Sequence, residues 1–377
     1  MKRTHAVGHA VGTALLAGLT ALTLAACGSD DNTTPQATDA ATGGATTGAP
    51  SASALAGTLA GEGSSAQDKA QQAWVAGFQT ANPDTTVNYT ATDSGGGRGK
   101  FLEGSVDFAG TDSALNEEEL ATSVERCFGG SGMDIPVYIS PIAVAFNIAG
   151  VDSLNLTPDV TAQIFAGTIT AWDDPAIAAL NEGVTLSGPI TVVHRSDDSG
   201  TSKNFQDYLS KTAPDVWTFT VSNTWPVSVG QGANGTSGVV QTIQAAQGTI
   251  GYADASAIGT LGRASLGVDA FVPPTAQAAA ATLDASPRAE GRADHDIAIA
   301  VDRTTTAPGA YPAILVSYLA VCDTYDSQEK VDLVKGYLSY VVSAQGQQVA
   351  AGAAGSAPLS DALRTDIQSA IDAITVG

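Results

Sequence analysis

The stretch ITVVHRSDDSGTSKNFQDYL, residues 190–209, has the pattern of a β-strand, a polar turn and an α-helix. The β-branched run before the turn is typical of a strand, and Phe205, Tyr208 and Leu209 after it recur at helical spacing. Ser199 or Thr201 can cap the helix, so that backbone N–H groups and the positive end of the helix dipole face the turn. Such a turn can bind an anion, but serine, aspartate and glycine also form turns and caps that bind nothing.

The rest of the chain repeats this order of elements. Strand-like and helix-like segments alternate from about residue 57 to the closing helices, which predicts the α/β class. Serine- and glycine-rich turns precede a helix at four places, residues 63–66, 94–99, 198–202 and 232–238. Four donor-rich helix starts could converge on a single anion.

The N-terminus has the features of a secretory signal. Two basic residues precede an apolar run that ends in small residues before Cys27, so residues 1–26 are predicted to be removed on export. The letters LAAC that end at Cys27 resemble a bacterial lipobox, which implies acylation of the Cys27 sulfur. An ordinary signal peptide followed by a chance cysteine is the alternative. Residues 27–56, rich in threonine, alanine and glycine, are predicted to be a disordered tether.

The chain is strongly acidic, with a formal net charge of −22. Such a surface argues against nucleic acid as a partner and against direct adhesion to anionic lipid. An anion could still bind in a desolvated cleft through one arginine and local dipoles, because distant charges are screened over about 8 Å at physiological salt. No segment after the signal is apolar for long enough to span a bilayer, so we expect membrane attachment only through the lipid anchor.

The sequence predicts no cofactor and no metal. GEGSSA, residues 61–66, and GQGANG, residues 230–235, have the spacing of the dinucleotide fingerprint, but the second follows no clear strand of a parallel sheet. An exported chain is also separated from nicotinamide cofactors. After the signal only His194 and His295 remain, and no Cys/His cluster has metal-ligand spacing.

Two cysteines remain if Cys27 is acylated. Cys127 and Cys322 are then left as a pair in an exported protein, where disulfides persist. This favours a bridge between them, with two buried thiols as the alternative.

Several motifs, taken in order, resemble those of the PstS-type phosphate-binding lipoproteins that serve phosphate ABC importers. VNYTATDSGGGRGKFLEGSVDFAGTDSAL, residues 87–115, is similar to the family's Ser-Gly-rich helix start followed by V-D-F-x-x-S/T-D. HRSDDSGTSKNFQDYL, residues 194–209, is similar to its R-x-D-x-S-G-T turn, and residues 164–181 and 248–254 resemble two further family segments. The resemblance covers nearly all of the chain after the tether, and Cys127 and Cys322 stand where actinobacterial members commonly have cysteines.

The resemblance implies a two-lobed periplasmic-binding-protein fold, type II-like, in which each lobe is a mixed sheet flanked by helices. The lobes would close on the ligand about two hinge strands. Lobe I would comprise residues 57–139 and 313–377, and lobe II residues 140–312. Both candidate disulfide cysteines fall in lobe I, so a bridge between them would not block the hinge.

The resemblance also implies, position by position, which residues bind phosphate. Lobe I would contribute Ser65, the N–H of Ala66, the hydroxyl and N–H of Ser94 and the carboxylate of Asp112; lobe II would contribute Arg195, the hydroxyl and N–H of Ser199, the N–H of Gly200, and the N–H and hydroxyl of Thr201. Asp197 would partner Arg195. Three charged residues next to these positions, Asp93, Arg98 and Asp198, depart from the family pattern and bear on the affinity.

The expected function is therefore capture of inorganic phosphate and its delivery to permease and ATPase subunits. The protein would be a lipid-anchored monomer on the extracytoplasmic face of the cell membrane, and not an enzyme. One alternative is a phosphate-sensing or cell-surface interaction lipoprotein that keeps the fold. Another is a phosphatase that uses Ser199 with His194, although the chain lacks the G-x-S-x-G motif and implies no third partner.

Overall fold

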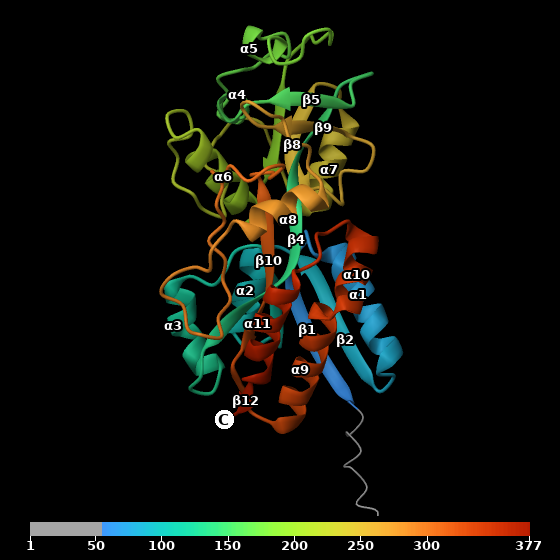
Figure 1. The fold of residues 1–377 in the computed structure, drawn as a ribbon, viewed down its shortest axis with the longest axis vertical. Coiled ribbons are helices and arrows are strands. Elements are labelled where there is room, and N and C mark those ends of the chain that lie inside the picture. Colours follow the sequence, from blue (N-terminus) through green and yellow to red (C-terminus); the bar gives the residue numbers. More distant parts are fainter. Residues whose placement is uncertain (1–54) are drawn as a thin grey trace, which may run out of the picture. The chain divides into compact units, whose positions relative to one another are not determined.

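The computed structural model of the chain describes residues 55–377 (Figure 1). The predicted signal, Cys27 and nearly all of the predicted tether lie outside these residues. The strands are β1 (Gly57–Ser64), β2 (Thr85–Thr92), β3 (Phe108–Thr111), β4 (Gly132–Asn147), β5 (Ser153–Leu156), β6 (Thr191–Arg195), β7 (Gln231–Ala233), β8 (Thr249–Asp254), β9 (Gly262–Leu266), β10 (Ile314–Cys322), β11 (Thr324–Tyr325) and β12 (Thr375–Val376).

Helices alternate with these strands, which confirms the predicted α/β class. The helices are α1 (Asp68–Ala81), α2 (Ser94–Leu102), α3 (Glu117–Arg126), α4 (Pro158–Phe165), α5 (Pro175–Ala178), α6 (Gly200–Thr212), α7 (Gly235–Ala245), α8 (Ala276–Asp284), α9 (Gln328–Val342), α10 (Ala344–Ala354) and α11 (Asp361–Asp372). Within residues 55–377 no helix combines the length and the apolar character needed to cross a membrane.

Most of the strands form one mixed sheet in the order β2-β1-β3-β10-β4-β8-β6-β7, with β9 paired to β4 and β5 paired to β9. Strand β1 is parallel to β2 and to β3, and β6 is parallel to β7 and to β8. Strands β10 and β4 run antiparallel to each other and separate these two parallel groups. Figure 1 shows β4 and β10 side by side between the two groups.

Strand β4 belongs to both parts of the sheet. Its residues from Gly132 to Pro141, except Val137 at a shift of register, pair with β10, and its last six, from Ile142 to Asn147, pair with β8. Every residue of β4 except Asn147 is buried, which explains why its sequence is an almost unbroken apolar run rather than an alternating one. The boundaries predicted for the two lobes fall within β4 and just before β10, and the division into lobes stays a prediction.

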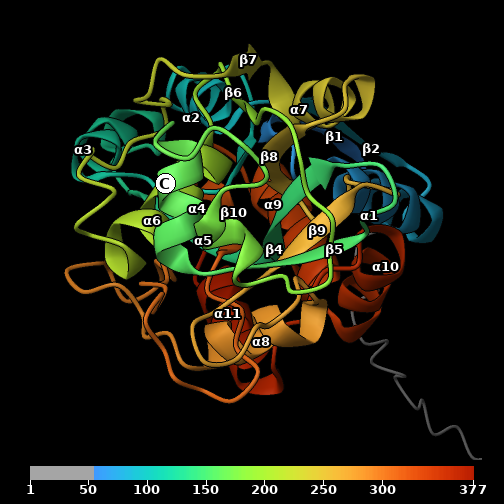
Figure 2. The same cartoon turned by 90° about the horizontal axis from the view of Figure 1, so that it is seen from above.

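Within each parallel group, the strands place their helix starts at the same end. The two groups run in opposite directions, and their carboxyl ends face each other near the middle of β4. Strands β1, β2 and β3 lead into α1, α2 and α3, while β6 and β7 lead into α6 and α7. Seen from above, α6 and α7 lie to either side of β8 (Figure 2). Ligands of open α/β sheets bind outside the carboxyl ends of the strands, so these turns are where a site is expected.

Candidate anion-binding site

The predicted ligand residues lie where four of these strands end. Ser65 and Ala66 follow β1, Ser94 follows β2, Asp112 follows β3, Arg195 ends β6, and Ser199, Gly200 and Thr201 lie at the start of α6. All of them except Ser65 are buried. Buried polar groups need hydrogen-bond partners, so the contacts between these residues define the site.

Contacts between helix starts bring the four serine- and glycine-rich turns together. The hydroxyl of Ser65, before α1, accepts a 3.1 Å hydrogen bond from the N–H of Thr236 in α7. The N–H of Gly95 in α2 donates to the carbonyl of Asp198, before α6, over 3.0 Å. A Cβ on Gly95 would lie 2.1 Å from Cγ of Asp198, so a larger residue here would force the Asp198 side chain to move. These contacts join the turns in two pairs, and Asp112 joins the pairs to each other through Ser64, Ser94 and Thr201. The four turns therefore converge, as the sequence alone could not show.

Asp112 is the acceptor at the centre of the site. Its Oδ1 accepts hydrogen bonds from the hydroxyls of Ser64 and Ser317, each at 2.6 Å. Its Oδ2 accepts from the hydroxyl of Thr201 at 2.8 Å. A carboxylate has about four lone-pair positions, so these three donors leave Oδ2 able to accept one more hydrogen bond. Its backbone N–H donates to Ser94 Oγ over 3.1 Å.

The side chains of Arg195 and Asp197, where β6 leads into α6, form a buried ion pair. Asp197 accepts from Nε of Arg195 at 2.7 Å and from Nη2, and it also accepts from the N–H of Gly235 at 3.2 Å. Burial alone would raise the pKa of Asp197, but the hydrogen bonds and charge of Arg195 outweigh it and lower that pKa. Within residues 55–377, Nη1 of Arg195 has no hydrogen-bond acceptor. The guanidinium is thus fixed by Asp197 and keeps donors for an anion.

Ser199 is the N-cap of α6, one of the two caps that the sequence allowed. Its Oγ accepts a 3.1 Å hydrogen bond from the N–H of Ser202, which leaves the hydroxyl proton for another acceptor. The neighbouring His194 does not pair with it. The Nδ1 atom of His194 lies 2.9 Å from the carbonyl oxygen of Arg195, and its ring stacks on Trp225. The base and nucleophile that a phosphatase would need are therefore not joined.

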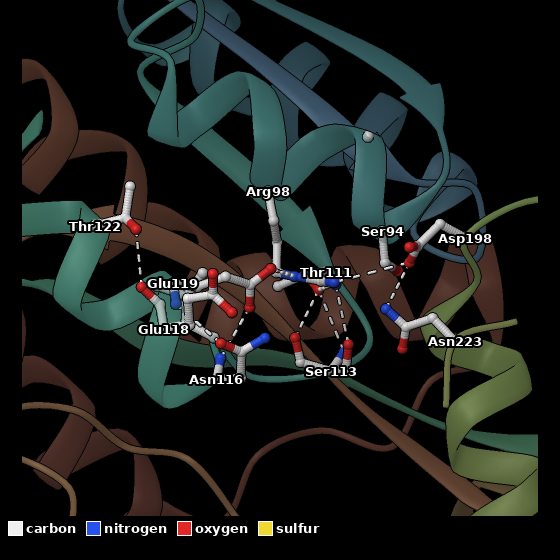
Figure 3. A network of polar contacts seen from close by, with 12 residues as sticks. Ser94, Arg98, Thr111, Ser113, Asn116, Glu118, Glu119, Thr122, Asp198 and Asn223 are labelled. Carbon is white, nitrogen blue, oxygen red and sulfur yellow. Dashed lines mark hydrogen bonds and ion pairs between the residues drawn. The ribbon is translucent and has the colours of Figure 1, made fainter. Parts of the chain in front are cut away.

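Two of the three charged residues that depart from the family pattern, Arg98 and Asp198, contact other side chains (Figure 3). Arg98 donates from Nε to Glu119 over 2.7 Å and from Nη1 to the hydroxyls of Thr111 and Ser113, each at 3.1 Å. Its Nη2 lies 3.8 Å from Oδ1 of Asp198.

The two acids of this set have local partners as well. Asp93 caps α2 by accepting from the N–H of Gly96 at 2.7 Å. Asn223 donates to Asp198 Oδ1 at 2.6 Å (Figure 3). Asp93, Arg98 and Asp198 therefore each have a hydrogen-bond or ion-pair partner close to the predicted ligand residues.

Three hydroxyls of the site were not identified from the sequence. Ser64 and Ser317 orient Asp112, and Thr236 pairs with Ser65. Ser64 directly precedes Ser65, which was predicted to bind the ligand, so the two adjacent serines could have indicated a role for Ser64. Ser317 gave no signal, because it lies inside the apolar run of β10. The N–H predicted to bind the anion at Ala66 donates to Ser64 Oγ over 3.1 Å.

The predicted bridge between Cys127 and Cys322 is confirmed, with a Cα–Cα distance of 5.2 Å. It joins Cys127, which directly follows α3, to Cys322, the last residue of β10. Among residues 55–377 no group of three or more His, Cys, Asp or Glu side chains is placed to hold a metal ion.

Comparison with known proteins identifies relatives over nearly the whole chain. A family model described as a PBP superfamily domain matches residues 36–345. The phosphate-binding protein PstS 3 of Mycobacterium leprae is 35% identical over 361 residues, which cover 94% of this chain and 96% of that protein. The phosphate-binding protein PstS 2 of Mycobacterium tuberculosis is 36% identical over 325 residues, which cover 83% and 86% of the two chains.

A solved structure shares the fold. The phosphate-binding protein from Stenotrophomonas maltophilia aligns with a TM-score of 0.69 at 22% identity, over 83% of this chain and 93% of that chain. This likeness concerns the fold alone, while the mycobacterial relatives show kinship in sequence. The chain belongs to the PstS family of phosphate-binding proteins, within the PBP superfamily.

Proposed function

We propose that this chain captures inorganic phosphate at the strand ends around Asp112 and Arg195 and delivers it to an ABC importer. One observation carries the proposal: a buried arginine with free donors and a buried acceptor-only carboxylate lie among convergent helix starts. Relatives that are 35% and 36% identical are named phosphate-binding proteins. The proposed ligand residues are Ser65, Ala66, Ser94, Asp112, Arg195, Ser199, Gly200 and Thr201, with Asp197 in support.

The charges of the site match a partly protonated oxyanion. Arg195 can bond two phosphate oxygens through its planar fork, while Asp197 holds the guanidinium in place. The N-terminal N–H groups of α6 add donors and a favourable dipole. Phosphate near neutral pH still carries a proton, and it can donate that proton to the remaining lone pair on Asp112 Oδ2. Sulfate has no such proton, so the same site would leave Asp112 facing an oxygen lone pair.

Binding of this kind accompanies closure of the two predicted lobes. The contacts that join Thr201 to Asp112 and Ser65 to Thr236 run from residues 57–139 to residues 140–312. In the proposed function these contacts form when the lobes close and break when phosphate is released to the permease. We propose that the protein does this as a monomer, on the extracytoplasmic side, with permease and ATPase subunits as partners.

Isothermal titration of the purified protein with phosphate, arsenate and sulfate tests the proposal. We expect saturable binding of phosphate, weaker binding of arsenate because it keeps its proton, and no heat from millimolar sulfate. Absence of phosphate binding in a protein that is correctly processed would contradict capture and would favour the cell-surface interaction role.

Attachment to the membrane is a separate proposal that rests on the lipobox-like letters before Cys27. Acylation of Cys27 would hold the protein at the cell surface while the tether lets it reach the permease. Fractionation of cells that produce Cys27→Ala should find the protein released to the medium. Retention of all of this variant in the membrane fraction would contradict the anchor.

A further inference from the structure

Asn204 lies on α6, outside the set of predicted ligand residues, and its amide joins two turns of the site. The Nδ2 group donates to the backbone carbonyl of Asp112 at 2.5 Å and to that of Gly200 at 3.0 Å. Asp112 follows β3, whereas Gly200 begins α6. The hydrogen bond from Asn204 to Asp112 therefore connects residues that the predicted lobe boundaries separate. It is made to the backbone of Asp112, whose carboxylate is the acceptor at the centre of the site.

Arg303 fixes the orientation of this amide. Its Nη2 donates to Oδ1 of Asn204 at 2.6 Å, and because an arginine only donates, the Nδ2 end must face the two carbonyls. Arg303 is itself held from several sides, with Nε 2.9 Å from Asp207 and Nη1 2.5 Å from the carbonyl of Ile314. Only 1% of its side chain is exposed. Ile314 is the first residue of β10, so Arg303 links Asn204 to a strand that pairs with both β3 and β4.

We infer that Asn204 is a positioning residue that stabilises the closed, phosphate-bound state without touching the anion, an inference that rests on the proposed function. Opening of the lobes would break the bond to Asp112 while leaving those to Gly200 and Arg303, which belong to the same side. The bond therefore contributes free energy to the closed state only. A group that acts in this way changes the rate of release and leaves the preference among oxyanions unchanged.

The surroundings of Asn204 indicate that its side chain can be shortened without loss of the fold. A pocket of about 330 Å³ adjoins Asn204 and is also lined by Asp112, Lys203 and Arg303. Water from this pocket can reach both the carbonyl of Asp112 and Nη2 of Arg303 once the amide is removed, so neither group is left unsatisfied.

The test compares Asn204→Ala with the wild-type full-length protein. Stopped-flow release of phosphate should be about tenfold faster in the variant, with little change in the association rate, as expected for the loss of one hydrogen bond. The dissociation constants for phosphate and for arsenate should rise by the same factor. Thermal unfolding of the phosphate-free variant should stay close to that of wild type, which a purely structural role would not allow.

Two further variants control the test. Asn204→Asp keeps an acceptor for Arg303 but replaces the donor with a second oxygen that repels the Asp112 carbonyl, so its release should be at least as fast as that of Asn204→Ala. Asn181→Ala removes an amide, here a buried one, that also donates to two carbonyls, of Asn155 and Ile177, within residues 140–312. It should lower the unfolding temperature and leave the release rate unchanged.

The outcomes separate the two proposals. Wild-type protein that binds phosphate, with an unchanged release rate in Asn204→Ala, would overturn this inference alone. A changed ratio of phosphate to arsenate affinity would also overturn it, because Asn204 would then contact the anion. Wild-type protein that does not bind phosphate would overturn the proposed function and the inference with it.

Discussion

The hydroxyl of Thr201 donates a 2.8 Å hydrogen bond to Oδ2 of Asp112, although 89 positions separate the two residues in the chain. Gly200 packs so closely beside them that a Cβ at this position would lie 2.8 Å from both Asp112 Cβ and Ser94 Oγ. The first residues of α6 therefore pack directly against the end of β3. Under the proposed function, this contact places donors and an acceptor around one small anion.

Replacing Asp112 with asparagine should weaken discrimination against sulfate. The amide can present an N–H group where the carboxylate offers only lone pairs, so sulfate gains a donor and protonated phosphate loses its best acceptor. We expect the ratio of phosphate to sulfate affinity to fall tenfold or more, because sites built around one hydrogen bond reject the wrong ligand by large factors. Competition titrations measure this ratio.

Asp107→Asn is the control for that substitution, because Asp107 pairs with Lys330 and the N–H of Ala60 away from the site. It removes the same charge and should leave the ratio unchanged. Displacement of phosphate from the wild-type protein by millimolar sulfate would contradict the role of Asp112.

Arg195→Ala should raise the dissociation constant for phosphate at least tenfold. Each lost charge-assisted hydrogen bond contributes about 1.5–3 kcal/mol, and about 1.4 kcal/mol corresponds to one decade of affinity. Arg195→Lys keeps the charge but loses the planar fork, so its affinity for phosphate should lie between those of wild type and Arg195→Ala. Arg288→Ala removes the same charge from an exposed position and serves as the control in titration calorimetry. An unchanged dissociation constant in Arg195→Ala would place the site elsewhere.

Loss of the disulfide should destabilise the protein without altering the site. Cys127 and Cys322 are 195 positions apart, and cross-links of this kind typically stabilise a domain by about 2–4 kcal/mol. The double variant with serine at both positions should show that decrease in the free energy of unfolding by denaturant, at an unchanged phosphate affinity. Labelling of either thiol in the native, unreduced protein would show that the bridge does not form in solution.

Asp254 should make the stability depend on pH in the acidic range. It is buried at the end of β8, where it accepts from the hydroxyl of Tyr138 at 3.1 Å, and burial raises its pKa to about 6 from an ordinary value of 3.8. The folded protein therefore keeps a proton that the unfolded chain releases, and stability falls as the pH rises through this window. The expected loss between pH 4 and pH 7 is on the order of 2 kcal/mol.

Denaturant unfolding of Asp254→Asn across this range is the measurement. The variant has no proton to lose at this position, so its stability should fall less than that of wild type over the same interval. Asp159→Asn, at an exposed position of α4, should keep the wild-type profile. Parallel profiles for wild type and Asp254→Asn would show that Asp254 titrates normally in the folded state.

Local patterns were enough to predict the class of fold, because strand and helix periodicities and capping residues act over a few positions, while the family was predicted from the resemblance of several motifs. Ser199 illustrates this, since its role as the cap of α6 follows from the residues next to it. The pairing of Cys127 with Cys322 followed from export and from the count of cysteines. The signal, the acylated cysteine, the ligand residues and the division into lobes stay predictions.

Residues whose role depends on distant partners were not predictable. Ser317 occupies a buried strand whose other residues nearly all are apolar, so nothing in its own neighbourhood distinguishes it from a core position. Asn204 occupies a polar position of an amphipathic helix, and its function arises only because the carbonyl of Asp112, 92 positions away, comes within 2.5 Å. Such contacts are set by the packing of the sheet rather than by local sequence.

The continuity of β4 has a consequence for how the protein unfolds. Because this strand is buried along nearly all of its length and pairs with β10 at one end and β8 at the other, neither half of the sheet can melt without exposing the paired backbone of the other. Unfolding should therefore be one cooperative event, and the amides where β4 passes from β10 to β8 should be among the slowest in the protein to exchange with solvent deuterium.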